Sequence, residues 1–266
     1  MNAEAVHVDH LIRTSTAFMI AAIGLAQLVR PCCFVGVGFY FRRACRALSP
    51  QAGEQVWETL RARSELEGDT SALMRYVAVF YFAMAALEFV PAVPFAVPYA
   101  AASLALALAI LAAYLQVKRA TDRRVAPLVR RSPLDALPPV VVVAMSLCFA
   151  GTLGFALYPP YRIAALAVAI SVALLFIIAW RIAGAPALLV GSDPQVAYAV
   201  DERVRLIRAT GVAALACAPP AVLVMLGARQ VVGFHLSGLL TAIVCAAFAV
   251  ALAASVMPFG KRLVIA

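Results

Sequence analysis

Charged residues are scarce in this chain, and no stretch of it is polar enough to form a separate soluble domain. Asp, Glu, Lys and Arg make up 13% of the 266 residues, whereas soluble domains carry about 25%. The hydrophobic fraction is 65% and the mean hydropathy is +0.95. This balance is typical of an integral membrane protein and predicts a single polytopic membrane domain over residues 1–266.

Sequence signatures of known chemistry are also missing. The chain has no Walker A loop, no H-E-x-x-H and no G-x-S-x-G. Its six cysteines form no C-x-x-C, and the adjacent pair Cys32–Cys33 is a poor disulfide candidate. His7 and His10 form an unsupported H-x-x-H, which is common by chance. We therefore expect no catalytic residue, no cofactor and no metal site.

The charges that are present gather in a basic loop, residues 118–131, between two long apolar runs. Its cations are Lys118, Arg119, Arg123, Arg124, Arg130 and Arg131. Such loops stay on the cytoplasmic side of a membrane, so this loop sets the sidedness of every other segment. On that topology 19 of the 22 Lys and Arg residues lie inside. The net charge of +9 then predicts a lipid bilayer as partner and no nucleic acid.

Apolar runs and polar breaks predict an all-α membrane bundle built from three hairpins. The hairpins cover residues 76–116, 139–180 and 209–257, and short amphipathic cytoplasmic helices cover 50–66 and 194–208. A first apolar segment, residues 15–41, is broken at Arg30–Pro31 and either crosses the membrane or is re-entrant. We expect seven crossings, or six plus that segment, with the C-terminus inside and the N-terminus outside. The acidic residues before Ser15 predict no cleaved signal peptide.

Three helix-start signals and two helix faces refine this prediction. A capping residue precedes proline at Ser49, Ser132 and Asp193. The first cytoplasmic helix carries an apolar strip of Val56, Trp57 and Leu60, and the second carries Val196, Val200, Val204 and Ile207. Favourable ion pairs are predicted within these helices, Glu58 with Arg61 and Asp201 with Arg205.

Few ionisable residues fall inside the apolar runs, and these are the candidate functional residues. Glu88 and His235 both lie in the outer half of the predicted bundle, on different hairpins, and could form a polar site for transport. The simpler interpretation places each at the headgroup region. Pro219 and Pro220 are expected to kink their helix.

Location and function are predicted only in outline. Lys118 and Lys261 are the only lysines, a bias typical of GC-rich bacterial genomes, so we expect a bacterial inner membrane. The best interpretation is a small permease or the membrane subunit of a transport system. The alternatives are a non-catalytic scaffold whose surface helices dock a cytoplasmic protein, and an intramembrane enzyme that modifies lipids.

Overall fold

The computed structural model describes most of the chain between residues 45 and 231. The described residues are 45–46, 48–67, 71–87, 89–90, 96–121, 132–157, 159, 162–191 and 193–231, with Thr14, Ala17, Phe18, Ile20, Ala21, Phe41 and Ala246. Within them the fold is all-helical, which confirms the all-α part of the predicted fold class. The broken segment 15–41 and the second half of the third hairpin lie outside the described residues.

Six α-helices and one 3-10 turn make up the described part of the chain. They are α4 (Pro50–Glu67), α5 (Ser71–Leu87), α6 (Ala96–Thr121), η1 (Pro133–Asp135), α7 (Pro139–Phe155), α8 (Arg162–Ala183) and α9 (Pro194–Val231). Within these described helices, two stretches are long and apolar enough to cross a membrane, Val97–Arg119 and Arg162–Ala183. The helices Ala78–Leu87 and Pro139–Phe155 are apolar but shorter.

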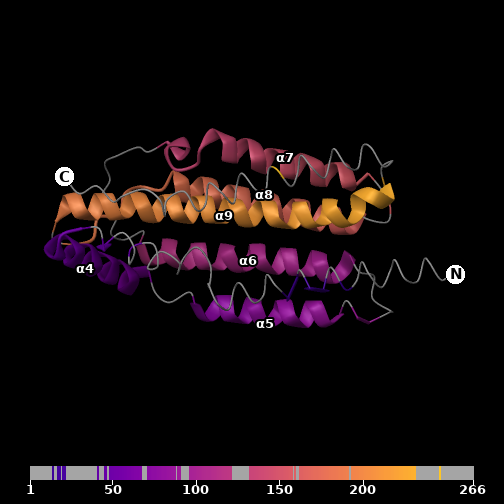
Figure 1. Cartoon of the computed structure of the whole chain (residues 1–266), viewed down its shortest axis with the longest axis horizontal. Coiled ribbons are helices and arrows are strands. Elements are labelled where there is room, and N and C mark those ends of the chain that lie inside the picture. The colour runs from indigo at the N-terminus through magenta and orange to yellow at the C-terminus, as the bar shows by residue number, and fades with distance from the viewer. Residues whose placement is uncertain are drawn as a thin grey trace.

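Helices α5 to α9 lie side by side along the long axis of the molecule, and α4 lies across one end (Figure 1). Helix α8 is central, since it contacts α6, α7, α9 and η1. Small side chains such as Ala165, Ala169 and Ala179 are buried on α8, and small residues let neighbouring helices approach closely. The bundle is therefore held by close helix–helix contact along α8.

The predicted helix starts are built as capping interactions. The Ser49 hydroxyl accepts a hydrogen bond from the backbone N–H of Ala52. The Asp193 carboxylate accepts from the N–H groups of Gln195 and Val196. Ser132 and Asp135 form a reciprocal capping box at η1. The three capping predictions are confirmed, although Ser132 caps the short turn η1, and α7 begins only at Pro139.

Helix α9 differs from the sequence prediction. A surface helix over 194–208 and a separate membrane helix from residue 209 were expected, but the two form one continuous helix of 38 residues. No glycine or proline interrupts the chain between Pro194 and Thr210, so nothing there ends the helix. At 1.5 Å per residue α9 is about 57 Å long, almost twice the roughly 30 Å of a bilayer core.

Helix α4 packs its apolar side against the first half of α9. Val56 and Leu60 form a buried cluster with Val196, Val200, Val204 and Ile207. The predicted face of α9 is thus confirmed. The predicted strip on α4 is partly wrong, because Trp57 is 39% exposed. Residues 56 and 60 are one turn apart and share a face, whereas residue 57 turns away from it.

Candidate functional site: a charged clamp and a basic cavity

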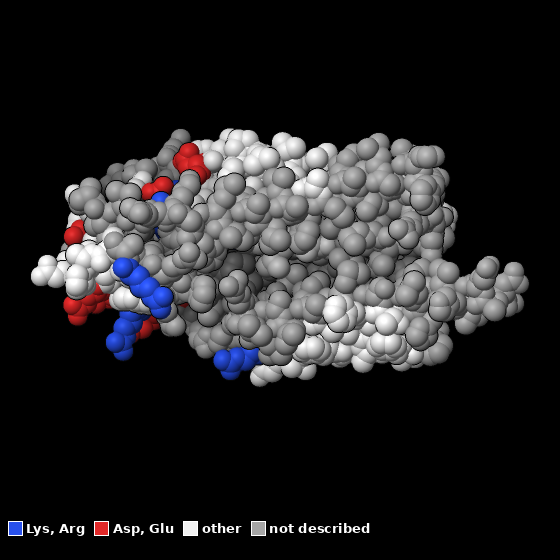
Figure 2. Space-filling view, viewed as in Figure 1, with Lys and Arg blue, Asp and Glu red and all other residues white. Residues whose placement is uncertain are grey.

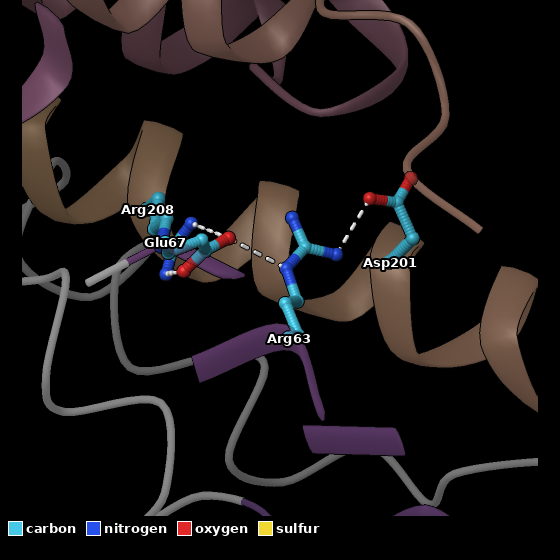
Figure 3. Close-up of polar contacts among 4 residues, drawn as sticks. All are labelled: Arg63, Glu67, Asp201 and Arg208. Carbon is cyan, nitrogen blue, oxygen red and sulfur yellow. Dashed lines mark hydrogen bonds and ion pairs between the residues drawn. The ribbon is translucent and has the colours of Figure 1, made fainter. Parts of the chain in front are cut away.

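One end of the bundle carries most of the charge visible on the face drawn in Figure 2. We call it the charged end: it holds α4, the C-terminal ends of α6 and α8, and the start of α9. Four side chains there form a buried ion-pair network, the clamp, which joins α4 to α9 (Figure 3). Its members are Arg63, Glu67, Asp201 and Arg208.

The clamp alternates positive and negative groups across the two helices. Arg63 donates from Nε to Glu67 Oε1 and from Nη1 to Asp201 Oδ1, each at 2.7 Å. Arg208 holds the other side of Glu67 with two bonds, from Nη1 to Oε1 at 2.8 Å and from Nη2 to Oε2. All four side chains are between 3% and 11% exposed. Each carboxylate therefore has a buried cationic partner, as buried charges require.

The clamp favours the ionised forms of Glu67 and Arg63. Burial raises the pKa of the Glu67 carboxyl, but the charges and hydrogen bonds of Arg208 and Arg63 outweigh burial and bring the pKa to about 2. Burial lowers the pKa of Arg63, yet the carboxylates of Glu67 and Asp201 leave it above its ordinary value. Glu67 is thus ionised at neutral pH and is a poor proton donor or acceptor.

Helical spacing explains how the sequence brings these residues together. Gly53, Val56, Leu60, Arg63 and Glu67 are buried on α4 at alternating steps of three and four residues, which is the spacing of one helix face. The charged pair therefore continues the apolar strip that packs on α9. Asp201 and Arg208 likewise share a side of α9, two turns apart. A charge that falls on the extension of an apolar strip is a signal that marks Arg63 and Glu67 as buried charges, although it does not identify their partners on α9.

Beside the clamp lies a basic cavity of about 260 Å³ between α4, α6, α8 and α9. Five cations line it, from all four helices: Arg63, Lys118, Arg181, Arg205 and Arg208. Among the described residues the carboxylates that line it are those of the clamp, Glu67 and Asp201. The described part of the lining therefore carries more positive than negative groups.

The depth of the five cations differs. Arg205 is buried and donates from Nη1 to the backbone carbonyl of Ala183 at 2.9 Å, where α8 ends. Lys118 and Arg181 are exposed and stand at the C-terminal ends of α6 and α8. The cavity thus has buried guanidinium groups inside and exposed cations at its rim.

The predicted transport pair cannot be compared with this site. Glu88 and His235 both lie outside the described residues, so their meeting in an outer pocket stays a prediction. Of the predicted topology determinants, Lys118 and Arg119 form the last turn of α6. The remaining four, Arg123, Arg124, Arg130 and Arg131, lie outside the described residues.

Pro219 and Pro220 lie inside the continuous helix α9 and are buried. Each lacks a backbone N–H, so the helix loses two of its internal hydrogen bonds there. The Tyr99 hydroxyl of α6 donates to the carbonyl of Pro219. The proline pair is therefore part of the contact between α6 and α9, at the end of the bundle opposite the clamp.

The predicted ion pairs within the two surface helices, Glu58 with Arg61 and Asp201 with Arg205, stay predictions, and two of their members have other partners. Arg61 lies 3.5 Å from Glu65, and Asp201 pairs across helices with Arg63. Among the described residues no group of three or more His, Cys, Asp or Glu side chains could hold a metal ion. Comparisons with protein-family models, curated proteins and solved structures find no match for this chain.

Proposed function

We propose that the chain is a multi-pass protein of a bacterial inner membrane, and that it serves as a small permease or as the membrane subunit of a transport system. The observation that carries this proposal is the basic cavity, a charged chamber between four helices at the point where their apolar stretches end. The bundle has about seven crossings, or six with a re-entrant first segment.

Helix length and surface character support a membrane location. Helix α8 has 22 residues and α6 has 26, or about 33 and 39 Å, which suits a bilayer core of roughly 30 Å. Large apolar side chains are exposed along the bundle, among them Val79, Val143 and Ile170 at 56–63%. A lipid environment is a favourable one for such exposed apolar side chains.

The distribution of charge supports an orientation with the charged end in the cytoplasm. Lys118, Arg181 and Arg208 come from different helices and line one cavity at that end. Positive residues at one end of a membrane bundle favour the cytoplasmic side. The first 15 residues of α9 then project beyond the bilayer, which accounts for its excess length. The C-terminus is placed inside and the N-terminus outside.

The cavity favours transport over the two alternatives. A docking scaffold would offer the apolar faces of α4 and of the start of α9, but these faces are buried against each other. A lipid-modifying enzyme needs a group that can exchange protons near pH 7, and Glu67 is held ionised with a pKa of about 2. A charged cavity reached from one side suits the inner site of a transporter.

Fusion reporters test the topology. Green fluorescent protein placed after Thr121 or Val190 is expected to fluoresce, because these positions lie inside. Alkaline phosphatase placed after Leu157 is expected to be active, because its disulfides form only outside the cytoplasm. An inactive phosphatase at Leu157, with full-length fusion present in the membrane, would contradict the proposed crossings of α7 and α8.

Transport is tested in proteoliposomes on a solid-supported membrane, with a panel of small anions, cations and neutral solutes. At least one solute is expected to give a saturable current that is reduced in Arg181→Gln, which removes a cation from the cavity rim. Arg119→Gln is the matched control, since Arg119 is exposed at the same end but does not line the cavity. Currents equal to those of empty liposomes for the whole panel would contradict a permease.

A further inference from the structure

We propose that α9 is hinged at Pro219–Pro220 and that the Tyr99 hydroxyl of α6 is the latch that holds the hinge closed. The latch is a buried hydrogen bond from this hydroxyl to the carbonyl of Pro219. The role of the hinge as the outer gate of a permease rests on the proposed function. The hinge and the latch themselves follow from contacts within the described part of the chain.

The proline pair weakens α9 at one point. In a regular α-helix the backbone N–H of each residue donates to the carbonyl four residues earlier. Pro219 and Pro220 have no N–H, so the carbonyls of Leu215 and Ala216 lose their ordinary donors. The proline rings also crowd these carbonyls, which favours bending. The first arm of α9, residues 194–218, is therefore joined to the second arm, residues 221–231, by a segment that bends more easily than a regular helix.

The two arms of α9 are held by different kinds of contact. The first arm is fixed near its start by the clamp and by the apolar cluster that it shares with α4. Leu223 of the second arm is buried in the main apolar cluster of the bundle. In a bilayer such an apolar contact is replaced by lipid at little cost, because lipid chains are as apolar as leucine. The hydrogen bond between Tyr99 and Pro219 is therefore the contact that opposes opening most directly.

Helix α6 places Tyr99 for this role. Tyr99 lies in the first turn of α6 and is 5% exposed. The Ser103 hydroxyl, one turn later, donates to the Tyr99 carbonyl at 3.0 Å. A phenolic hydroxyl that is buried away from water requires an acceptor, and the Pro219 carbonyl supplies it. Breaking the latch removes that acceptor, so the closed position is favoured.

The latch lies at the end of the bundle opposite the basic cavity. A transporter that works by alternating access closes one end of its pathway while the other end is open. The cavity lies at the charged end, and movement of the second arm of α9 away from α6 opens the opposite end. The bond between Tyr99 and Pro219 is then the contact that must break before that end can open.

Alkylation of a native cysteine measures this opening without requiring transport. Cys217 is fully buried two residues before the hinge, whereas Cys45 is partly exposed at the charged end. The full-length protein in detergent is treated with N-ethylmaleimide, and the labelling rate of each cysteine is followed by peptide mass spectrometry. The variant is Tyr99→Phe, which removes only the hydroxyl. Ser171→Ala is the matched control, because it removes a buried hydroxyl that donates within α8.

Tyr99→Phe is expected to speed the labelling of Cys217 by roughly twofold to tenfold, the effect of one buried hydrogen bond, and to leave Cys45 unchanged. Ser171→Ala should label as the parent does. In a background with Pro219→Ala and Pro220→Ala, which restores two N–H groups to α9, the acceleration by Tyr99→Phe should vanish because the helix no longer bends there.

Equal labelling of Cys217 in Tyr99→Phe and in the parent overturns the inference, and so does equal acceleration by Tyr99→Phe and Ser171→Ala. An acceleration that persists in the alanine background also overturns it, and if that background does not fold, the comparison of the two hydroxyl deletions decides. Faster labelling in Tyr99→Phe without flux of any solute contradicts only the permease. Flux through a protein whose Cys217 labels equally in every variant overturns only this inference.

Discussion

Replacing Glu67 by glutamine should loosen the contact between α4 and α9 more than any exposed charge substitution on α4. The carboxylate accepts one hydrogen bond from Arg63 and two from Arg208. Glutamine keeps the shape but has a single acceptor oxygen, and its amide N–H groups would face a guanidinium. The variant therefore leaves Arg208, which is 7% exposed, as a buried cation without its ionised partner.

Two independent estimates give the size of this effect. Removing one partner of a buried ion pair costs about 3–5 kcal/mol. The pKa of Glu67 falls from its ordinary value of 4.5 to about 2, which corresponds to about 3 kcal/mol in favour of the ionised form in the folded protein. For chains of this size each kcal/mol moves the thermal midpoint by about 2–4 °C. At about 3 kcal/mol, the value common to both estimates, a fall of roughly 6–12 °C is expected for Glu67→Gln.

Thermal unfolding of the detergent-solubilised protein, followed by circular dichroism, measures this shift. The matched control is Glu65→Gln on the same helix, because Glu65 is 72% exposed and its contact with Arg61 spans 3.5 Å. Exposed pairs of this kind contribute little, so the control should melt within about 2 °C of the parent. A Glu67→Gln midpoint that matches the control would refute the clamp as a stabilising contact.

Two further measurements probe the same end of the bundle. The pKa of Glu67 is about 2 in the folded protein against 4.5 in the unfolded chain. Its contribution of about 3 kcal/mol to stability is therefore present above pH 4.5 and is lost as the pH falls towards 2. The melting temperature should consequently drop more steeply with acid in the parent protein than in Glu67→Gln. Gly191 has a φ of +123°, and a Cβ there would lie 2.9 Å from the Thr59 hydroxyl, so Gly191→Ala should cost about 1–3 kcal/mol. Gly154 lies in the last turn of α7, and a Cβ there would meet nothing within 4 Å. Gly154→Ala should therefore be neutral or stabilise by less than about 1 kcal/mol. Equal melting of the two alanine variants would contradict the close contact between Gly191 and Thr59.

The predictable part of this structure is the part that depends on local sequence. Capping by Ser49 and Asp193 requires only a short side chain next to a helix start, and both caps are present. The apolar face of α9, from Val196 to Ile207, follows from a spacing of three and four residues. Helix class and helix faces could therefore be inferred without knowledge of the tertiary contacts.

The clamp could not be predicted in the same way, because its partners are separated by 138 and 141 residues. Local rules pair Asp201 with Arg205 four residues later, a favourable contact on an isolated helix. In the bundle α4 also brings Arg63 against Asp201, a contact that no local rule predicts. The predicted helix end at residue 208 is wrong for a related reason. A change from polar to apolar composition marks a change of environment along the chain, but it does not end a helix.

The clamp is a costly way to join two helices that already share an apolar contact. A buried ion-pair network often contributes no more stability than apolar side chains of the same volume, and α4 could have continued the strip of Val56 and Leu60 to α9. What apolar residues could not supply is a rigid set of guanidinium groups. Arg63 and Arg208 both pair with Glu67 and both line the basic cavity, so the carboxylates that hold them in place also fix part of the cavity wall. The stability of the α4–α9 contact and the shape of the cavity therefore depend on the same side chains, and the rim residues Lys118 and Arg181 are the positions at which the charge of the cavity can be changed while the clamp stays intact.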